Sequence, residues 1–269
     1  MDIKSLDYKY SKPYRYPVRL SFEDDKLVIY VFAKFAKSLL KPYKALKDGI
    51  KDHSLQCKND LFTYADAICE GIVRNWNGSY NLPNGQNVKL DVRIIRYNGV
   101  KTKQRYLKFN HEILNKYSFV RSPFYRCIWG IFRNNGQFES FGLNWTPRHP
   151  GSVYLRKTNY LKTYEQTAAH EFGHVLGLGD AYGAYYRGYY EAPGTGHYMM
   201  NANTRVQPEE VAMMLKAQSV GKMQYFPRVI SFENFTKRFQ QVKARKLADK
   251  NRKQNEKKNA QKKGALTKR

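Results

Sequence analysis

The chain has 269 residues, 42% of them hydrophobic, which is enough for one large folded domain or two small ones. No run approaches about 18 consecutive apolar residues, and residues 1–20 lack the apolar centre of a signal peptide. We therefore expect no membrane span and no secretion directed by these residues, and a protein that is cytoplasmic as made. A fragment cut from a longer exported chain would look the same. The formal net charge is +26, so anionic partners have to be considered.

The three cysteines, Cys57, Cys69 and Cys127, are odd in number, and no two of them are spaced as C-x-x-C. This pattern favours free or buried thiols over a redox pair or a zinc ribbon. A second interpretation is that Cys57, which precedes the motif described below, binds the metal as a thiolate and acts as a latch.

The first elements in chain order are predicted to be two strands and a helix. Residues 16–35 form two apolar runs around the polar turn Glu23-Asp24-Asp25, and the second run is apolar on both faces, as in a buried strand. Residues 60–78 place apolar side chains at steps of three or four from Leu61 to Trp76, which predicts a helix that ends at Gly78.

Further strands are predicted up to residue 157. Residues 87–99 alternate and close with the turn pair Asn98-Gly99, and residues 125–145 indicate a hairpin around an Asn-Asn-Gly turn at 134–136. Residues 151–157 indicate a short strand. Together with the helices, these strands predict a layered α+β fold.

The chain after residue 180 begins with a loop rich in glycine and tyrosine, without a regular period. Its five tyrosines are Tyr182, Tyr185, Tyr186, Tyr189 and Tyr190. A helix is then predicted from Pro208, because proline suits the first helical position and Glu209 and Glu210 suit the first turn. Gly221 marks its end.

The C-terminal tail is strongly basic. Residues 236–269 hold 14 Lys/Arg against two acidic residues, a net +12. The tail starts as an amphipathic helix and loses its apolar period after Leu247, which predicts a frayed or disordered segment. Three interpretations stay open: a solvated tail, a segment that binds nucleic acid or another anionic surface, and a segment for partner or delivery contacts.

The stretch "HEFGHVLGLGD", residues 170–180, carries the chemistry. His170 and His174 are four residues apart, so on a helix both imidazoles face the same side and can reach one metal ion. Glu171 stands beside that position without binding the ion, where a base for an activated water belongs. A capping box at Thr163 and Gln166 is predicted to start the helix.

A catalytic zinc needs a third protein ligand and one open position, so the helix must stop and the chain must turn back. Gly177 lies three residues after His174, where a left-handed turn costs a glycine little. Asp180 follows three residues later and can return its carboxylate to the ion. The alternative is that the histidines form a surface pair or are satisfied in the core.

This stretch resembles the signature of the metzincin clan of zinc peptidases, H-E-x-x-H-x-x-G-x-x-H followed by a methionine turn. Asp180 replaces the third histidine, as in the snapalysin and immune-inhibitor branches, which the sequence resembles more closely. The downstream stretch "HYMMNANTRVQPEEV" is similar to a methionine turn and the C-terminal helix of such enzymes. The whole resemblance covers about residues 14–225.

The resemblance implies a metzincin-like fold: a twisted mixed sheet, an active-site helix, and a small C-terminal subdomain with the methionine turn and a helix. Met200 is the expected floor of the site, with Met199 as the alternative. Residues 151–157 would be the edge strand that pairs with substrate. Ala202 stands where some metzincins carry a tyrosine, so that role is vacant or passes to Tyr182, Tyr198 or another loop tyrosine.

The expected organisation is an N-terminal extension at 1–13, a metallopeptidase domain at 14–230 and the basic tail at 231–269. The domain would divide into an upper part up to residue 177 and a lower part at 178–230. These boundaries place the whole motif at the junction of the two parts.

The function implied is a zinc-dependent endopeptidase that cleaves protein or peptide substrates, with Zn²⁺ on His170, His174 and Asp180 and Glu171 as the catalytic base. The resemblance extends to metallopeptidase domains of bacterial polymorphic toxins, which implies delivery or secretion as an effector or toxin. The alternatives are a catalytically silent zinc-containing binding protein and a basic nucleic-acid-binding protein in which the motif is incidental.

Overall fold

The computed structural model describes most of the chain between residues 10 and 227. The described residues are 10, 12–43, 62–115, 117–127, 142–158, 160–182 and 192–227. The basic tail, Cys57 and the loop tyrosines after Tyr182 lie outside them, as does the predicted turn at residues 134–136.

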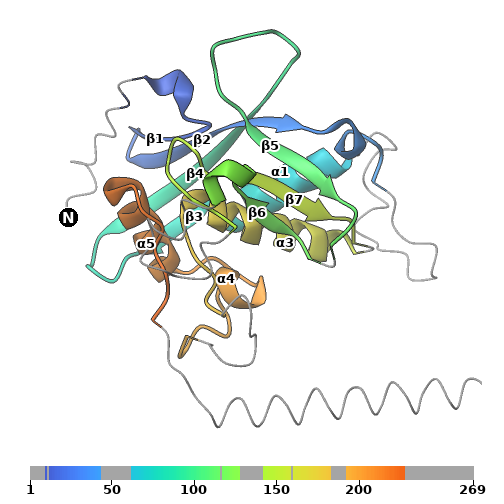
Figure 1. Cartoon of the computed structure of the whole chain (residues 1–269). Helices are drawn as coiled ribbons and strands as arrows, with labels where there is room; N and C mark the ends of the chain where they lie inside the picture. The colour runs from blue at the N-terminus through green and yellow to red at the C-terminus, as the bar shows by residue number, and fades with distance from the viewer. Residues whose placement is uncertain are drawn as a thin grey trace, which may run out of the picture.

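The described elements form one mixed sheet with helices packed against it (Figure 1). The strands are β1 (Val18–Glu23), β2 (Lys26–Phe35), β3 (Gly78–Asn81), β4 (Asn87–Arg96), β5 (Leu107–Glu112), β6 (Phe119–Arg121) and β7 (Ser152–Arg156). The helices are η2 (Pro13–Arg15), η3 (Lys37–Leu39), α1 (Tyr64–Trp76), α3 (Leu161–Leu176), α4 (Met199–Ala202) and α5 (Pro208–Val220). An α+β fold, as the sequence predicts, is confirmed.

The sheet has seven strands in the order β3-β4-β2-β5-β7-β6, and β1 pairs with the first half of β2. Its centre is parallel, because β2 runs parallel to both β4 and β5, and β5 parallel to β7. The outer pairs, β3 with β4, β6 with β7 and β1 with β2, are antiparallel. Helix α1 lies in the connection between the parallel strands β2 and β4.

The strand pair predicted at residues 16–35 is confirmed. Asp24 and Asp25 both have positive φ, 44° and 62°, as a two-residue hairpin turn requires. The following strand, β2, is buried on both faces along most of its length. Its double apolar pattern is therefore explained by its position at the centre of the sheet.

The strand at residues 151–157 is confirmed as β7, but the prediction that it is the edge strand is wrong. β7 lies between β5 and β6, and β6 ends the sheet. β6 could not be predicted because a strand of three residues is too short to show an alternating pattern. The predicted hairpin at 125–145 also fails at its start, since residues 124–127 form a helical turn.

Two helix boundaries differ from the prediction. The capping box predicted at Thr163 does not exist, because α3 begins two residues earlier, at Leu161. Thr163 is already inside the helix, and its carbonyl accepts a hydrogen bond from the Thr167 hydroxyl. A capping box does start α1, where Thr63 and Asp66 bond reciprocally. Gly78 does not end α1 but begins β3, with Asn77 as the last cap.

Helices α1 and α3 pack closely against each other beside the sheet, with a glycine at the crossing (Figure 1). A Cβ at Gly71 would lie 2.5 Å from the Cα and the carbonyl oxygen of Glu165. The Trp76 indole donates to the carbonyl of Ala169, and Arg74 forms an ion pair with the nearly buried Glu165. This contact fixes the position of the helix that carries the histidines.

The smaller C-terminal part contains α4 and α5. The helix predicted from Pro208 is confirmed, including its left-handed end at Gly221. Within the described residues, no helix is both long enough and apolar enough to cross a membrane.

The close crossing predicts that Gly71→Ala destabilises the protein. Alanine usually stabilises a helix interior relative to glycine by about 1 kcal/mol. Here the added methyl must push the two helices apart, at a cost of about 1–3 kcal/mol, so the free energy of unfolding should fall. Urea denaturation measures it, with Gly78→Ala as the control, because its Cβ would make only an ordinary contact with Tyr80. Equal or greater stability of Gly71→Ala would contradict the close approach.

Candidate metal centre

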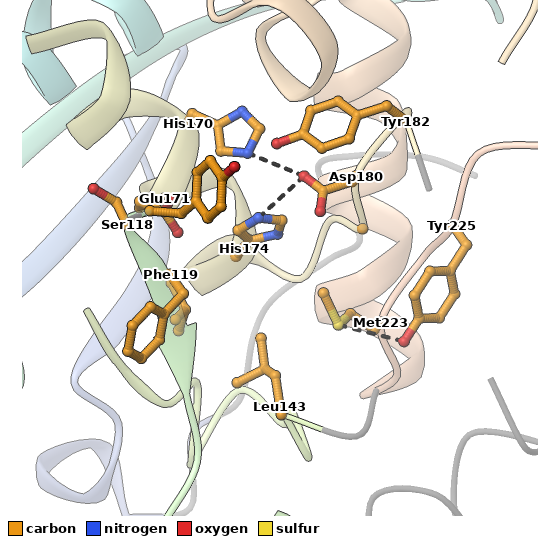
Figure 2. A pocket seen from close by; sticks show the side chains of 14 residues that line it. Ser118, Phe119, Leu143, His170, Glu171, His174, Asp180, Tyr182, Met223 and Tyr225 are labelled. Atoms are coloured by element: carbon orange, nitrogen blue, oxygen red, sulfur yellow. Dashed lines mark hydrogen bonds and ion pairs between the residues drawn. The ribbon is translucent and has the colours of Figure 1, made fainter. Parts of the chain in front are cut away.

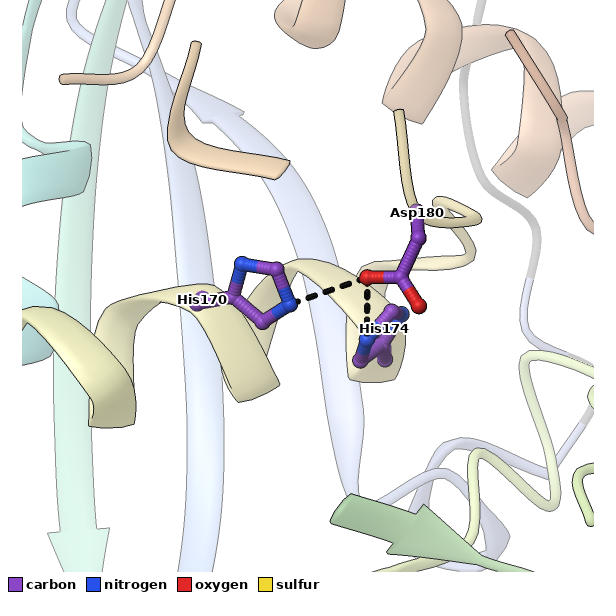
Figure 3. Close-up of side chains that lie close together, drawn as sticks. All are labelled: His170, His174 and Asp180. Carbon is purple, nitrogen blue, oxygen red and sulfur yellow. Dashed lines mark hydrogen bonds and ion pairs between the residues drawn. The ribbon is translucent and has the colours of Figure 1, made fainter. Parts of the chain in front are cut away.

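The structure brings together the three residues that the motif predicts as metal ligands. His170 and His174 lie one turn apart on α3, and Asp180 returns to them from the segment after the helix (Figure 2, and closer in Figure 3). The Nε2 atoms of His170 and His174 lie 3.0 and 3.4 Å from Oδ1 of Asp180. The ligand atoms of all three residues lie within 4.8 Å of one another.

Backbone carbonyls orient both imidazoles. Nδ1 of His170 lies 2.8 Å from the carbonyl oxygen of Met199, and Nδ1 of His174 lies 2.8 Å from that of Leu178. A carbonyl only accepts, so each Nδ1 must carry the proton that it donates. In a neutral ring, Nε2 is then left with its lone pair, and both lone pairs point at the carboxylate oxygen of Asp180.

The electrostatics of the three groups indicate that a positive charge belongs between them. Burial opposes the charged form of His174, but the Asp180 carboxylate outweighs it and raises the pKa of the imidazole to about 9. Burial opposes the Asp180 carboxylate as well, but the two histidines hold its pKa well below its usual range. The raised pKa of His174 and the lowered pKa of Asp180 both mean that this half-buried carboxylate is stabilised by a positive charge beside it.

The arrangement fits a divalent transition metal. Ligands about 2.0–2.1 Å from a tetrahedral ion lie about 3.3 Å from one another, close to the 3.0 and 3.4 Å that separate the two histidines from Asp180. Two imidazoles and one carboxylate are donors that such ions accept. Because three protein ligands leave a fourth position free, the chain can hold an ion and keep one position for another molecule.

Glu171 lies beside this group with an unused oxygen. Its side chain is buried, and its Oε2 has no hydrogen-bond partner among the described residues. Burial raises the pKa of Glu171, while the neighbouring His174 and His170 act in the opposite direction. Leaving a buried carboxylate oxygen without a hydrogen bond costs free energy. We therefore expect a proton or a water molecule to be its partner in solution.

The turn that returns Asp180 depends on Gly177. Helix α3 ends there in a left-handed conformation with φ of 99°, as the sequence predicts. Its backbone then pairs with Gln224, which accepts from Gly179 N–H at 2.8 Å and donates to the Gly177 carbonyl at 2.8 Å. Trp145 packs directly against Gly177 and donates its indole N–H to the Val175 carbonyl.

The methionine pair lies under the histidines. Both side chains are fully buried, and Met200 Sδ packs where a Cβ of Gly173 would be. Met199 contributes through its carbonyl, which orients His170. The carboxylate of Glu210 on α5 accepts from the backbone N–H groups of Met199 and Met200, and burial raises its pKa to about 7 against these bonds. The sequence predicts the methionines but not this contact with Glu210.

The candidate ligands face a cavity of about 540 Å³ that also includes Glu171 (Figure 2). Its other walls come from β6 and the residue before it, from Gly142 and Leu143, and from Tyr182, Met223 and Tyr225. Of the tyrosines considered from the sequence, Tyr182 lies here, its ring 6.1 Å from that of His170 and nearly parallel to it. Tyr198 is not among the lining residues and packs against Phe226.

Several of these residues could not be found from the sequence. Tyr117 and Phe119 belong to a segment too short to show a period, and Tyr225 reaches the cavity only because residues 177–179 pair with Gln224. Cys69 and Cys127 are free thiols, and neither belongs to the cluster of candidate ligands. The Cys57 latch lies outside the described residues.

Comparison of the chain with protein-family models, with curated proteins and with solved structures finds no match. The site therefore has to be interpreted from its own geometry.

The geometry predicts that the metal stabilises the fold. A ligand present at 1,000 times its Kd contributes about 4 kcal/mol, so a chelator should lower the Tm of the metal-loaded protein by about 10 °C. His174→Ala should remove metal binding and the effect of the chelator, measured by metal analysis and thermal unfolding. The control is His197→Ala, at an exposed histidine outside the cluster. Metal retained at full stoichiometry in His174→Ala would refute the assignment.

The turn predicts that Gly177→Ala costs more stability than Gly221→Ala. Both glycines are left-handed, with φ of 99° and 68°, so alanine strains both by about 1–2 kcal/mol. At Gly177 the methyl would also lie 2.7 Å from Trp145 and 2.8 Å from Ala217, while nothing lies within 4 Å at Gly221. We expect an additional loss of about 1–3 kcal/mol in urea denaturation, and weaker metal binding, for Gly177→Ala alone. Equal losses would show that Trp145 does not restrain the turn.

Proposed function

We propose that the protein is a zinc-dependent endopeptidase with a metzincin-like fold. The observation that carries this proposal is the group formed by two imidazoles, one carboxylate and the unpaired Glu171 oxygen on the wall of a single open cavity. The cavity has the size of an ordinary ligand site. The mixed sheet, the glycine turn and the buried methionines under the histidines also support the resemblance to metzincins.

The residues present fit zinc better than a hard cation. Mg²⁺ and Ca²⁺ prefer a set of oxygen ligands, whereas two imidazoles with one carboxylate and an open position are typical of catalytic zinc. His170, His174 and Asp180 would hold the ion. When bound, it supplies a Lewis acid that polarises a carbonyl and acidifies a water molecule.

Glu171 moves the proton in this proposal. Its Oε2 accepts the proton of the attacking water, and the same oxygen then delivers that proton to the nitrogen of the leaving amine. The burial that raises its pKa helps the carboxyl group to hold the proton between the two steps. The carbonyls of Met199 and Leu178 keep both imidazoles in the orientation that the ion needs.

The substrate lies along β6 in this proposal. β6 is the last strand of the sheet among the described residues, and three consecutive residues before and within it, Ser118, Phe119 and Val120, line the cavity. An extended peptide can add to such an edge through backbone hydrogen bonds, which recognise any sequence. Tyr182 lies beside His170 on the same cavity and is our candidate for the hydroxyl that stabilises the carbonyl oxygen during attack. Delivery of the protein as a toxin or effector stays a prediction from the resemblance alone.

The proposal predicts that Glu171→Gln abolishes cleavage and keeps the metal. Loss of the proton acceptor should lower kcat/KM on an unfolded protein such as casein by about 10² to 10⁴-fold, with unchanged zinc content. Glu70→Gln, at a half-buried glutamate of α1 that does not line the cavity, is the control and should keep full activity.

The other outcomes separate the alternatives. Zinc in wild type and Glu171→Gln without cleavage by either, over a broad set of unfolded substrates, would favour the silent zinc-containing binding protein. Failure of both to bind zinc would remove the metal site and leave the basic nucleic-acid-binding protein.

A further inference from the structure

Four cationic or titratable side chains gather next to the cavity, and we refer to Arg105, Arg126, Arg148 and His149 as the arginine cluster. The Arg105 guanidinium lies 2.8 Å from Nε2 of His149. Burial, together with the charges of Arg126, Arg105 and Arg148, lowers the pKa of His149 to about 4. Burial is the larger cause of this shift, and the contribution of the three arginines indicates that their charges lie near the imidazole.

Carboxylates are missing from the described chain segments around the arginine cluster. Residues 97–111, 118–127 and 142–164 contain no Asp or Glu. Among the described residues, no carboxylate forms an ion pair with Arg105 or Arg148. Arg148 instead lies over the ring of Tyr16, and Arg105 donates its backbone N–H to the Tyr14 carbonyl. Within the described residues, the positive charges of Arg105 and Arg148 are therefore not paired with a carboxylate.

The arginine cluster adjoins one end of the cavity. Arg126 and Asn144 are joined by two hydrogen bonds, one in each direction between side chain and backbone. Asn144 directly follows Leu143, which lines the cavity (Figure 2). On the other side, Ser122 continues β6 and donates its N–H to the carbonyl of Gly142, another lining residue. The arginine cluster therefore lies beyond the C-terminal end of β6.

The direction of a bound peptide follows from the strand order. A peptide that pairs with β6 in the antiparallel sense, which is the slightly more stable one, runs from the C-terminal end of β6 toward its start. Its N-terminal part then lies nearest the arginine cluster, and the part opposite Ser118 and Phe119 lies at the metal ligands. Residues several positions before the cleaved bond come closest to the guanidinium groups.

We propose that the arginine cluster binds acidic side chains of a polypeptide lying along β6, on the N-terminal side of the bond to be cleaved. This inference rests on the proposed function for the position of that bond. The planar guanidinium fork matches a carboxylate with two parallel hydrogen bonds, and Arg105 and Arg148 offer such forks without an acidic partner of their own.

An acidic polypeptide suits this surface better than a nucleic acid. A phosphate backbone is bound by many cations along an extended track, whereas these side chains form a compact group at the end of a cavity. The substrate must enter that cavity as an extended chain, and the arginine cluster lies on the continuation of its path. Binding of acidic residues is thus coupled to the position of the peptide in the cavity.

The first experiment measures binding without cleavage. The full chain with Glu171→Gln is loaded with zinc and titrated into a fluorescent ten-residue peptide with four glutamates in its N-terminal half, or into the same peptide with four glutamines. At about 150 mM salt we expect the glutamate peptide to bind about five- to tenfold more tightly. The double variant Arg105→Gln with Arg148→Gln should lose most of that preference.

The matched control removes two charges elsewhere. Lys89→Gln with Lys216→Gln changes two exposed lysines on β4 and α5 and should keep the preference for the glutamate peptide. An equal loss in both double variants would overturn the proposal, because only the net charge would then matter. Tighter binding of an oligonucleotide with the same number of charges, lost in the arginine variant, would overturn it in favour of a nucleic acid.

A charge exchange gives a result that loss of folding cannot imitate. Arg105→Glu with Arg148→Glu should reverse the preference, so that a peptide with four lysines binds more tightly than the glutamate peptide. Thermal unfolding checks that this variant is folded. A folded variant that shows no reversal would overturn the proposal.

The second experiment tests the direction of the peptide with the wild-type enzyme. Peptides with the glutamates before or after a common cleavable segment are compared by kcat/KM, and we expect the first to be cleaved about five- to tenfold faster. Faster cleavage of the second would overturn the antiparallel placement. If neither peptide nor any unfolded protein is cleaved while the binding preference is found, the proposed peptidase fails and the acidic-peptide site stands.

Discussion

A helix that has to stop three residues after its second histidine is the constraint on which the site depends. If α3 continued past Leu176, Asp180 would move away along the helix axis and the two imidazoles would have no third donor. Gly177 ends the helix because it accepts a positive φ of 99° without the cost that a Cβ would bring. The chain can then return the Asp180 carboxylate to the two imidazoles.

The surroundings of the turn come from distant parts of the chain. Trp145 closes one side, and Gln224 pairs with the turn on another. Glu210 of α5 accepts hydrogen bonds from the backbone N–H groups of Met199 and Met200. The carbonyl of Met199 in turn accepts a hydrogen bond from His170. Helices α4 and α5 thus support the candidate ligands, although neither helix contributes one.

The motif could be predicted from the sequence, and so could the strands and helices whose apolar residues recur with a regular period. Each of these features is encoded by residues that are close together in the chain. Residues 170–180 combine donor spacing with a glycine at the one position where it is needed, and the turn at Asp24 and Asp25 is equally local. The position of β6 at the edge could not be predicted, because strand order depends on pairing between distant segments. The start of α3 was misplaced for another reason: a Thr and a Gln at capping-box spacing also occur inside helices, where neither side chain caps anything.

The unpaired oxygen of Glu171 has a consequence for the stability of the whole fold. A buried acceptor costs about 1–3 kcal/mol unless a proton or a water serves as its partner, and such a cost is a large fraction of the net stability of an ordinary domain. The close packing of α1 on α3 and the buried tryptophans have to offset this cost for the chain to stay folded. In the proposed peptidase, Glu171 serves proton transfer at a position where stability alone would favour an apolar side chain of similar size.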